Sequence, residues 1–227
     1  LERLPATLLL TGTAFVLSLL LGMTLGALAS RHRGRRLDSA ITELALVFFA
    51  TPLPWLAMMA VLVFSVLLGW LPAFGYMTVG ANLTGIDHVL DVARHLVLPA
   101  ATLGLFYMAV YARMTRASML EVSQMDFVKT ARAKGVPRGR TRHILRNALL
   151  PVVTLAGIQA GSLIGGAVLT ETVFAWPGIG RLMFDALLQR DYNLLLGCFL
   201  FTAAMAVLFN LLTDLLYALV DPRIELT

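Results

Sequence analysis

The chain has 227 residues, of which 59% are hydrophobic and 14% charged, and its mean hydropathy is +0.82. Soluble domains carry roughly 45–50% apolar and about 25% charged residues, so a water-soluble fold of this size could not bury so much apolar surface. The single cysteine, Cys198, excludes an intrachain disulfide and the usual cysteine-based metal sites. The net charge of +5 does not indicate nucleic-acid binding, because the basic residues lie between apolar stretches.

Five apolar stretches are long enough to cross a membrane, because about 20 helical residues span the roughly 30 Å hydrocarbon layer. In chain order they are 5–29, 44–71, 96–112, 147–170 and 192–213. Pro5 falls in a first helical turn, where its missing N–H is tolerated. Pro52 and Pro54 predict a kink or break near the start of the second stretch. The third is short, and we expect its helix to continue through Arg113 and Arg116, whose long side chains reach the membrane surface.

The chain is therefore predicted to be one all-α transmembrane domain, 1–227, and its charges predict an orientation. Of the 18 Lys and Arg residues, 14 lie in the loop after the first span, in 113–146 or at the C-terminus. Short loops rich in Lys and Arg stay in the cytoplasm, which predicts a cytoplasmic C-terminus and an external N-terminus. Because the sequence starts at Leu1 without Met or a signal peptide, we expect a preceding span and six helices in the full protein.

Motifs that would indicate an enzyme or a metal centre are missing from the sequence. It has no G-x-x-x-x-G-K-[ST] phosphate loop, so we expect no ATP hydrolysis by this chain. Its four histidines include no H-x-x-x-H pair, and no cofactor is predicted. Asp214, with Asn210 one turn earlier, is the clearest charge within a span, and a structural tie to a neighbouring helix is favoured over proton coupling.

Small residues at four-residue spacing predict close packing between helices. Gly157, Gly161 and Gly165 form two overlapping G-x-x-x-G steps, and Gly22 and Gly26 form a third. The fourth span is therefore expected to lie centrally in the bundle or at a subunit interface.

The long basic segment 121–146 is predicted to contain a short cytoplasmic helix. Ser123 and Asp126 are candidate N-caps, and Gly135 followed by Pro137 is a typical helix stop. The helix between them would have about two to three turns and a length of roughly 12 Å. A basic helix lying on lipid is the alternative, but its apolar face, with Phe127 the one large residue, is narrow for membrane burial. A groove on another protein suits it better.

The sequence D-F-V-K-T-A-R-A-K-G from Asp126 to Gly135, followed by R-N-A-L-L-P ending at Pro151, resembles the EAA loop of permeases of binding-protein-dependent ABC importers. The branch that imports dipeptides, oligopeptides and nickel is most similar. Three further segments also resemble this branch: E-T-V-F-A-W-P-G-I-G from Glu171, R-D-Y from Arg190, and the end of the chain. Lys129 stands where the general motif has Glu, as is usual in the peptide branch.

This resemblance implies a type I importer permease fold and a defined set of partners. They are a second permease subunit, two cytoplasmic ATPases and an extracytoplasmic solute-binding protein, in the cytoplasmic membrane of a bacterium or archaeon. The EAA loop of such systems forms a coupling helix that docks into the ATPase. The residues expected to make this contact are Asp126, Phe127, Thr130, Ala131, Ala133 and Gly135.

The segment 174–193 is predicted to interrupt the last two spans at the outer surface. Trp176, Pro177 and Gly178 should end the fourth span, and the apolar residues that follow recur at helical spacing. We expect a short amphipathic helix that helps to form an outer mouth for the binding protein. Membrane-surface anchoring by Trp176 and Tyr192 is an equal alternative.

Two other functions are compatible with a bundle of apolar helices. One is a stand-alone secondary carrier, and the other is a membrane scaffold or channel subunit. Paired charges inside the spans would favour a carrier, and the sequence has almost none. The candidate docking helix favours an ATPase partner.

Overall fold

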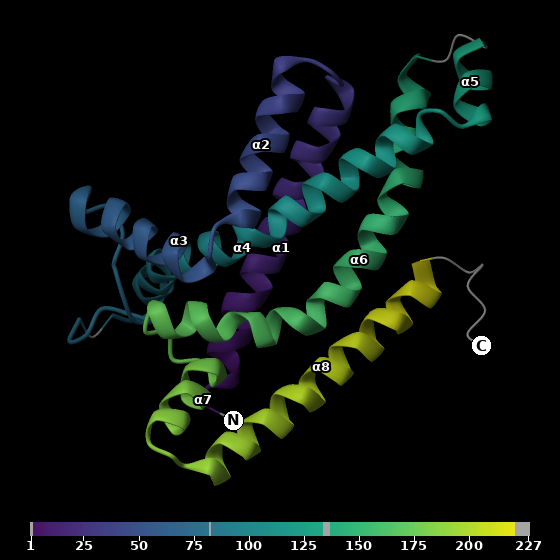
Figure 1. Cartoon of the computed structure of the whole chain (residues 1–227). Coiled ribbons are helices and arrows are strands. Elements are labelled where there is room, and N and C mark those ends of the chain that lie inside the picture. Colours follow the sequence, from purple (N-terminus) through teal and green to yellow (C-terminus); the bar gives the residue numbers. More distant parts are fainter. Residues whose placement is uncertain (1, 82, 134–136, 221–227) are drawn as a thin grey trace. The chain divides into compact units, whose positions relative to one another are not determined.

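The computed structural model describes residues 2–81, 83–133 and 137–220, and the regular structure in these ranges is helical (Figure 1). The elements are α1 (Leu4–Arg31), α2 (Arg36–Ala50), α3 (Leu53–Ala60), the π-helix η1 (Val61–Leu67), α4 (Ile86–Val122), α5 (Asp126–Ala133), α6 (Pro137–Val173), α7 (Ile179–Leu188) and α8 (Tyr192–Val220). The predicted all-α fold class is confirmed.

Three of the predicted spans appear as single helices that are long and apolar enough to cross a membrane. They are α1, α4 and the part Tyr192–Leu211 of α8. The fourth predicted span lies within α6, a continuous helix of 37 residues. Its apolar stretch among the described residues is shorter, Asn147–Gly161.

The second predicted span is broken. Residues Arg36–Ala50 and Leu53–Leu67 together are apolar enough to cross a membrane, but they meet at an angle of 104°. Pro52 precedes α3 in an extended conformation with ψ of 127°, and Pro54 lies in the first turn. A proline has no N–H for the preceding turn and favours a non-helical residue before it, so two of them end α2 and start a new helix. The predicted break is thus confirmed.

The chain forms two compact units. Unit 1 contains Leu1–Leu17, Thr51–Leu105 and Gln159–Thr227, and unit 2 contains Ser18–Ala50 and Phe106–Ile158. The helices α1, α4 and α6 each begin in one unit and end in the other.

Each unit has its own apolar core. In unit 1, Ala57 and Val61 pack with Leu98 of α4 and with Phe174, which follows α6. In unit 2, residues near the end of α4 pack with α5 and the first half of α6; these residues are Met119, Val122, Val128, Ile144 and Ala148. The two cores position the two segments that the sequence singled out, the turn between α6 and α7 in unit 1 and the short helix α5 in unit 2.

Glycines allow close approach of helices within each unit. In unit 2, a Cβ on Gly22 would collide with Tyr111, and one on Gly26 would lie 2.5 Å from the carbonyl oxygen of Ala112. These contacts confirm the packing that was predicted for the Gly22 and Gly26 pair.

The three glycines of α6 behave differently from one another. Gly157 is buried. In unit 1, a Cβ on Gly161 would lie 2.5 Å from Oδ1 of Asn210 on α8. Gly165 is exposed, and no described atom would lie within 4 Å of a Cβ at this position. Close packing therefore occurs at Gly161 and not at Gly165 among the described residues. The side chain of Asp214, expected to act with Asn210, lies outside the described residues.

Candidate functional site

The short helix expected in the basic segment is α5, which begins at Asp126 and ends at Ala133. It lies beside the adjoining ends of α4 and α6 (Figure 1). Val128 is the residue that holds it there: this side chain is 2% exposed and belongs to the core of unit 2 with Met119 and Ile144. Among its described side chains, one apolar residue thus attaches α5 to its own unit.

The other described side chains of α5 are exposed. Phe127 is 42% exposed, although it is large and apolar, and Asp126, Thr130 and Ala133 are exposed as well. Lys129 forms an ion pair with Asp126 at 2.7 Å between Nζ and Oδ1. Of the other predicted coupling residues, Ala131 is part of α5 but its side chain lies outside the described residues, and so does Gly135. The helix presents an apolar residue next to charged and hydroxyl groups.

Ser123 does not act as the predicted N-cap of α5. Its hydroxyl donates to the carbonyl oxygen of Leu120 at 2.7 Å and so closes the last turn of α4. Serine side chains readily bond to a carbonyl three residues earlier, and that local bond competes with capping. Asp126, the other candidate, is the first residue of α5.

An ion pair joins α2 to α4 in unit 2. Arg116 donates from Nε to Oδ1 of Asp38 at 2.6 Å and from Nη2 to Oδ2 at 2.8 Å, and the N–H of Gly34 donates to the same carboxylate at 3.0 Å. Asp38 is 5% exposed. A bidentate carboxylate thus holds the guanidinium of Arg116. The expectation that this side chain reaches the membrane surface stays a prediction. The partners are 78 residues apart, so no local spacing indicated them.

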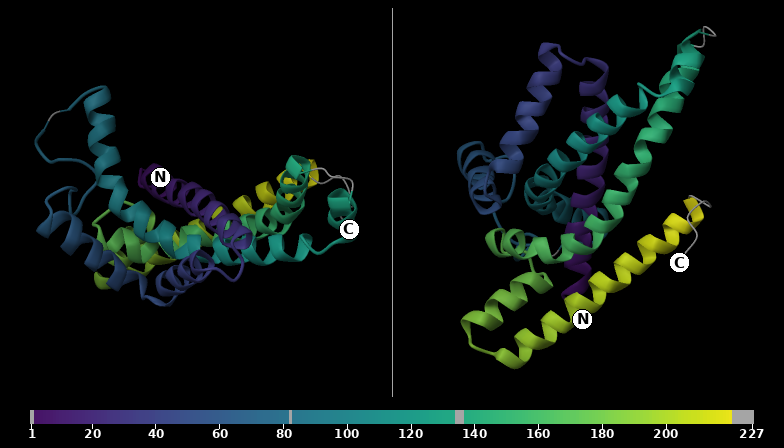
Figure 2. Two further views of the ribbon diagram at one scale, coloured as in Figure 1. Left: turned by 90° about the horizontal axis from the view of Figure 1, so that it is seen from above. Right: turned by 45° about the vertical axis from the view of Figure 1, so that its right-hand side comes forward.

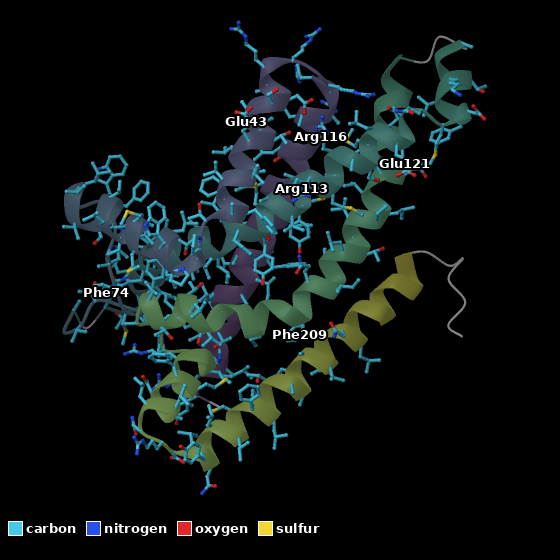
Figure 3. The ribbon with its side chains drawn as sticks, in the orientation of Figure 1. Glu43, Phe74, Arg113, Arg116, Glu121 and Phe209 are labelled. Atoms are coloured by element: carbon cyan, nitrogen blue, oxygen red, sulfur yellow. The ribbon has the colours of Figure 1, made fainter. Side chains whose placement is uncertain are left out.

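A cavity of about 500 Å³ lies beside this ion pair within unit 2. The guanidinium of Arg113 lies 5.9 Å from the ring centroid of Phe49, and both residues line the cavity. Figure 3 shows Arg113 and Arg116 along α4. The remaining lining residues are Thr42, Val110, Met114, Ala117 and Leu155. The walls are mainly apolar, with positive charge at one side.

The chain breaks between α6 and α7, as the sequence predicted. We call residues 171–181, which contain this break, the outer turn, after the side of the membrane that the sequence predicts for it. The helix ends at Val173, Ala175 takes a left-handed conformation with φ of 51°, and α7 begins at Ile179. The N–H of Trp176 returns to the carbonyl oxygen of Glu171 at 2.8 Å, which closes the turn. The short helix expected within 174–193 is α7, and it folds back beside the beginning of α8 (Figure 2).

Trp176 is a core residue of unit 1. It is fully buried, its indole Nε1 donates to the carbonyl oxygen of Ala6 at 2.8 Å, and the Tyr76 ring meets it edge-on at 4.9 Å between centroids. Anchoring of Trp176 at the membrane surface, one of the two expectations, is therefore wrong. A tryptophan placed at a chain reversal can pack inward as well as outward, since its N–H needs one acceptor in either place. Tyr192, the other expected anchor, is 61% exposed.

Glu171 lies at the centre of the outer turn and is fully buried. Its Oε1 accepts a hydrogen bond from the hydroxyl of Thr7 at 2.7 Å, and its Oε2 accepts one from the N–H of Arg181 at 3.0 Å. The same Thr7 hydroxyl accepts the N–H of Ile179 at 2.8 Å. We name these groups the clasp: Thr7, Glu171 and the N–H groups of Ile179 and Arg181. Sequence reasoning missed it, because its two side chains are 164 residues apart.

Among the residues that the structure describes, no three His, Cys, Asp or Glu side chains gather where they could hold a metal ion. The two regions with a defined geometry are thus α5 with its exposed face and the outer turn with its clasp. In the clasp, the Thr7 hydroxyl and the Glu171 carboxyl group are both buried away from the surface. The arrangement of the two regions suits contact with other proteins.

Residues 18–226 match the family described as "Binding-protein-dependent transport system inner membrane component". The chain belongs to this family. The permease is 42% identical to the di/tripeptide transport system permease protein DppB of Pseudomonas aeruginosa (strain UCBPP-PA14), over 97% of the chain and 70% of that protein. It is 42% identical to the dipeptide permease DppB of Escherichia coli (strain K12), over 98% and 71%. The oligopeptide permease AppB of Bacillus subtilis (strain 168) is 40% identical, over 98% and 70%.

Solved structures show the same fold in the permease. The MetNI methionine ABC transporter, in an inward-facing conformation, contains a chain that superposes with a TM-score of 0.74 at 17% identity, covering 97% of this chain and 95% of that one. A chain of an amino acid ABC transporter with histidines gives a TM-score of 0.64 at 18% identity, covering 98% and 92%. The type I importer fold implied by the motifs is confirmed.

The comparisons also decide the class of function. The chain is the permease subunit of a binding-protein-dependent ABC importer, a membrane protein and a transport component rather than an enzyme. A permease of this kind works with a partner permease, an ATPase and a solute-binding protein. The alternatives of a secondary carrier and of a scaffold or channel subunit are not favoured.

Proposed function

We propose that this permease imports short peptides. The relatives described above are named for dipeptides, for di- and tripeptides, or for oligopeptides, and they match nearly the whole chain at 40–42% identity. These names favour peptide over nickel, the other solute of this branch. Two permease subunits, which we expect to be paralogues, would form the pathway with two ATPases below it and the binding protein outside.

In this proposal α5 is the coupling helix and lies in the cytoplasm with the C-terminus. The main support is the difference in burial between two neighbouring side chains of α5: Val128 is buried in the core of unit 2, whereas Phe127 is 42% exposed. Phe127 is therefore available to a partner, and its burial there would remove apolar surface from contact with water. Asp126, Thr130 and Ala133 would border the contact, together with Ala131 and Gly135.

A matched set of variants tests the assignment of α5. Ala131→Glu places an unpaired charge at the proposed interface, and Phe127→Ala removes its largest apolar group, so both should lower ATPase retention and peptide uptake. Lys129→Gln is the control, since Lys129 is exposed and its ion pair with Asp126 is exposed as well. Membrane abundance, ATPase co-purification and uptake are measured for each. Full retention and uptake in both test variants at normal abundance would show that α5 does not couple.

In unit 1, we propose that Trp176, Pro177 and Gly178 shape the outer mouth and that α7 meets the binding protein. Leu187 and Leu188 are 52% and 68% exposed. Reversing the charges of Asp185 and Arg190 should reduce stimulation of the ATPase by the binding protein. Unchanged stimulation in that variant would assign the face of α7 to lipid.

A further inference from the structure

Three segments of unit 1 meet at one carboxyl group. Thr7 lies near the beginning of α1, Glu171 near the end of α6, and the N–H groups of Ile179 and Arg181 at the beginning of α7. The Glu171 side chain is fully buried, and its described partners are a hydroxyl and a backbone N–H rather than a cationic side chain. The hydroxyl and the N–H both donate to the carboxyl oxygens, which act as acceptors.

The Thr7 hydroxyl has a role in the clasp that few side chains could fill. It donates its single hydrogen to Glu171 and accepts the N–H of Ile179 with its oxygen. Both bonds are needed, because a buried donor or acceptor left without a partner is costly. Serine offers the same hydroxyl, whereas valine has the shape of threonine and neither function.

The turn around the clasp is held at further points. A Cβ on Gly178 would collide with the Glu171 carboxyl group, so the turn passes directly over it. The Arg181 guanidinium donates to the carbonyl oxygen of Ala175, the residue with φ of 51°. Trp176 binds the carbonyl oxygen of Ala6, next to Thr7. The outer turn is thus attached to α1 at two neighbouring residues, Ala6 and Thr7.

These attachments matter for α7 because it has 10 residues. An isolated helix shorter than about 12–15 residues is marginal in water, so its orientation must come from its contacts. Its buried residues are Ile179, Gly180 and Ala186, and two of them adjoin the clasp. The start of α8 follows α7 and contacts it, so the same contacts orient both helices.

We propose that Glu171 and Thr7 are positioning residues that fix α7 to α1 and remain bonded throughout the transport cycle. Contact of the binding protein with α7 would then move the outer part of α1 together with α7. The pair touches no solute, and its effect on transport acts through α7. This step rests on the proposed contact between α7 and the binding protein.

The first test compares Thr7→Ser with Thr7→Val in the complete importer reconstituted in lipid nanodiscs. The measured quantity is the ratio of ATPase activity with binding protein to activity without it. Thr7→Ser should keep the wild-type ratio, whereas Thr7→Val should lower it by about tenfold, the size expected for unpaired buried polar groups. Glu171→Gln should resemble Thr7→Val. The carboxylate accepts hydrogen bonds from the Thr7 hydroxyl and the Arg181 N–H, whereas an amide would turn its NH2 group, itself a donor, toward one of them.

The second test is hydrogen exchange of the outer turn, and it separates the clasp from its proposed use. The amides of Ile179 and Arg181 should be protected equally in the nucleotide-free and the ATP-trapped complex, and should exchange faster in Thr7→Val. Loss of protection in either state of the wild-type complex, or unchanged exchange in Thr7→Val, would overturn the clasp. Faster exchange with an unchanged ATPase ratio would overturn its role in positioning α7 for the binding protein, while the clasp itself stands.

Discussion

Position 178 requires glycine because the Glu171 carboxyl group occupies the space that a Cβ would fill. Its backbone, with φ of −96° and ψ of −179°, is extended and open to any residue. We predict that Gly178→Ala destabilises the permease by about 1–3 kcal/mol, the usual effect of overpacking a filled core. The apparent melting temperature of the purified importer measures this change.

Gly165→Ala is the matched control for that substitution. Gly165 has no described atom within 4 Å of an added methyl group, and it lies within α6, where alanine is a better helix former than glycine by up to about 1 kcal/mol. The control should leave the melting temperature unchanged or raise it. If Gly178→Ala behaves as the control does, the space between Gly178 and Glu171 is not filled as described.

A second prediction concerns the buried carboxylate of Asp38. Asp38→Asn removes the charge that Arg116 binds through two nitrogens, and we expect a loss of about 1–3 kcal/mol, at the low end for a broken pair because Arg116 is partly exposed. Lys129→Gln breaks an exposed pair, which is worth at most about 1 kcal/mol. Equal melting temperatures for the two variants would contradict a structural role of the Asp38 pair.

Single residues were the least predictable part of this molecule. Glu171 and Thr7 are separated by 164 positions, and Asp38 and Arg116 by 78, so their pairing depends on the folded chain. Trp176 was expected to face either the outer mouth or the lipid, and its burial comes from an acceptor on α1 that no local pattern contains.

Among the elements, α5 is packed against unit 2 through Val128, while its Phe127 side chain is exposed. We predict that Val128→Ala loosens α5 by about 1–3 kcal/mol, because it leaves a cavity beside Met119 and Ile144. Limited proteolysis of the purified permease should then cut near α5 at a higher rate. Phe127→Ala should leave the cleavage rate unchanged and lower only ATPase retention. Faster cleavage in Phe127→Ala but not in Val128→Ala would show that Phe127, and not Val128, attaches α5 to unit 2.

Helices could be predicted from the sequence where their position depends on nearby residues alone. Uncharged stretches predicted α1, the middle of α4 and most of α8, and prolines predicted the break before α3. The angle of 104° at that break could not be predicted, because it depends on how α3 packs in unit 1. The helix stop expected at Gly135 lies outside the described residues and stays a prediction.

For the whole molecule, the positive charges predict which ends face the cytoplasm. Single cysteines at positions 33 and 138 should react only with reagents that enter the cell, and cysteines at positions 87 and 185 should react from outside. The experiment uses a Cys198→Ala background, since Cys198 is the one native cysteine and is buried. Labelling of position 138 from outside in intact cells would refute the orientation.

Uptake by purified components tests most directly whether this chain is the permease of an ATP-driven peptide importer. The permease, its partner permease and the ATPases are placed in proteoliposomes with ATP at the ATPase side, and the binding protein and a labelled dipeptide are added at the other side. We predict uptake that requires both ATP and the binding protein and that is abolished by Ala131→Glu at normal protein content. Uptake that continues without ATP, or without the binding protein, would contradict this function.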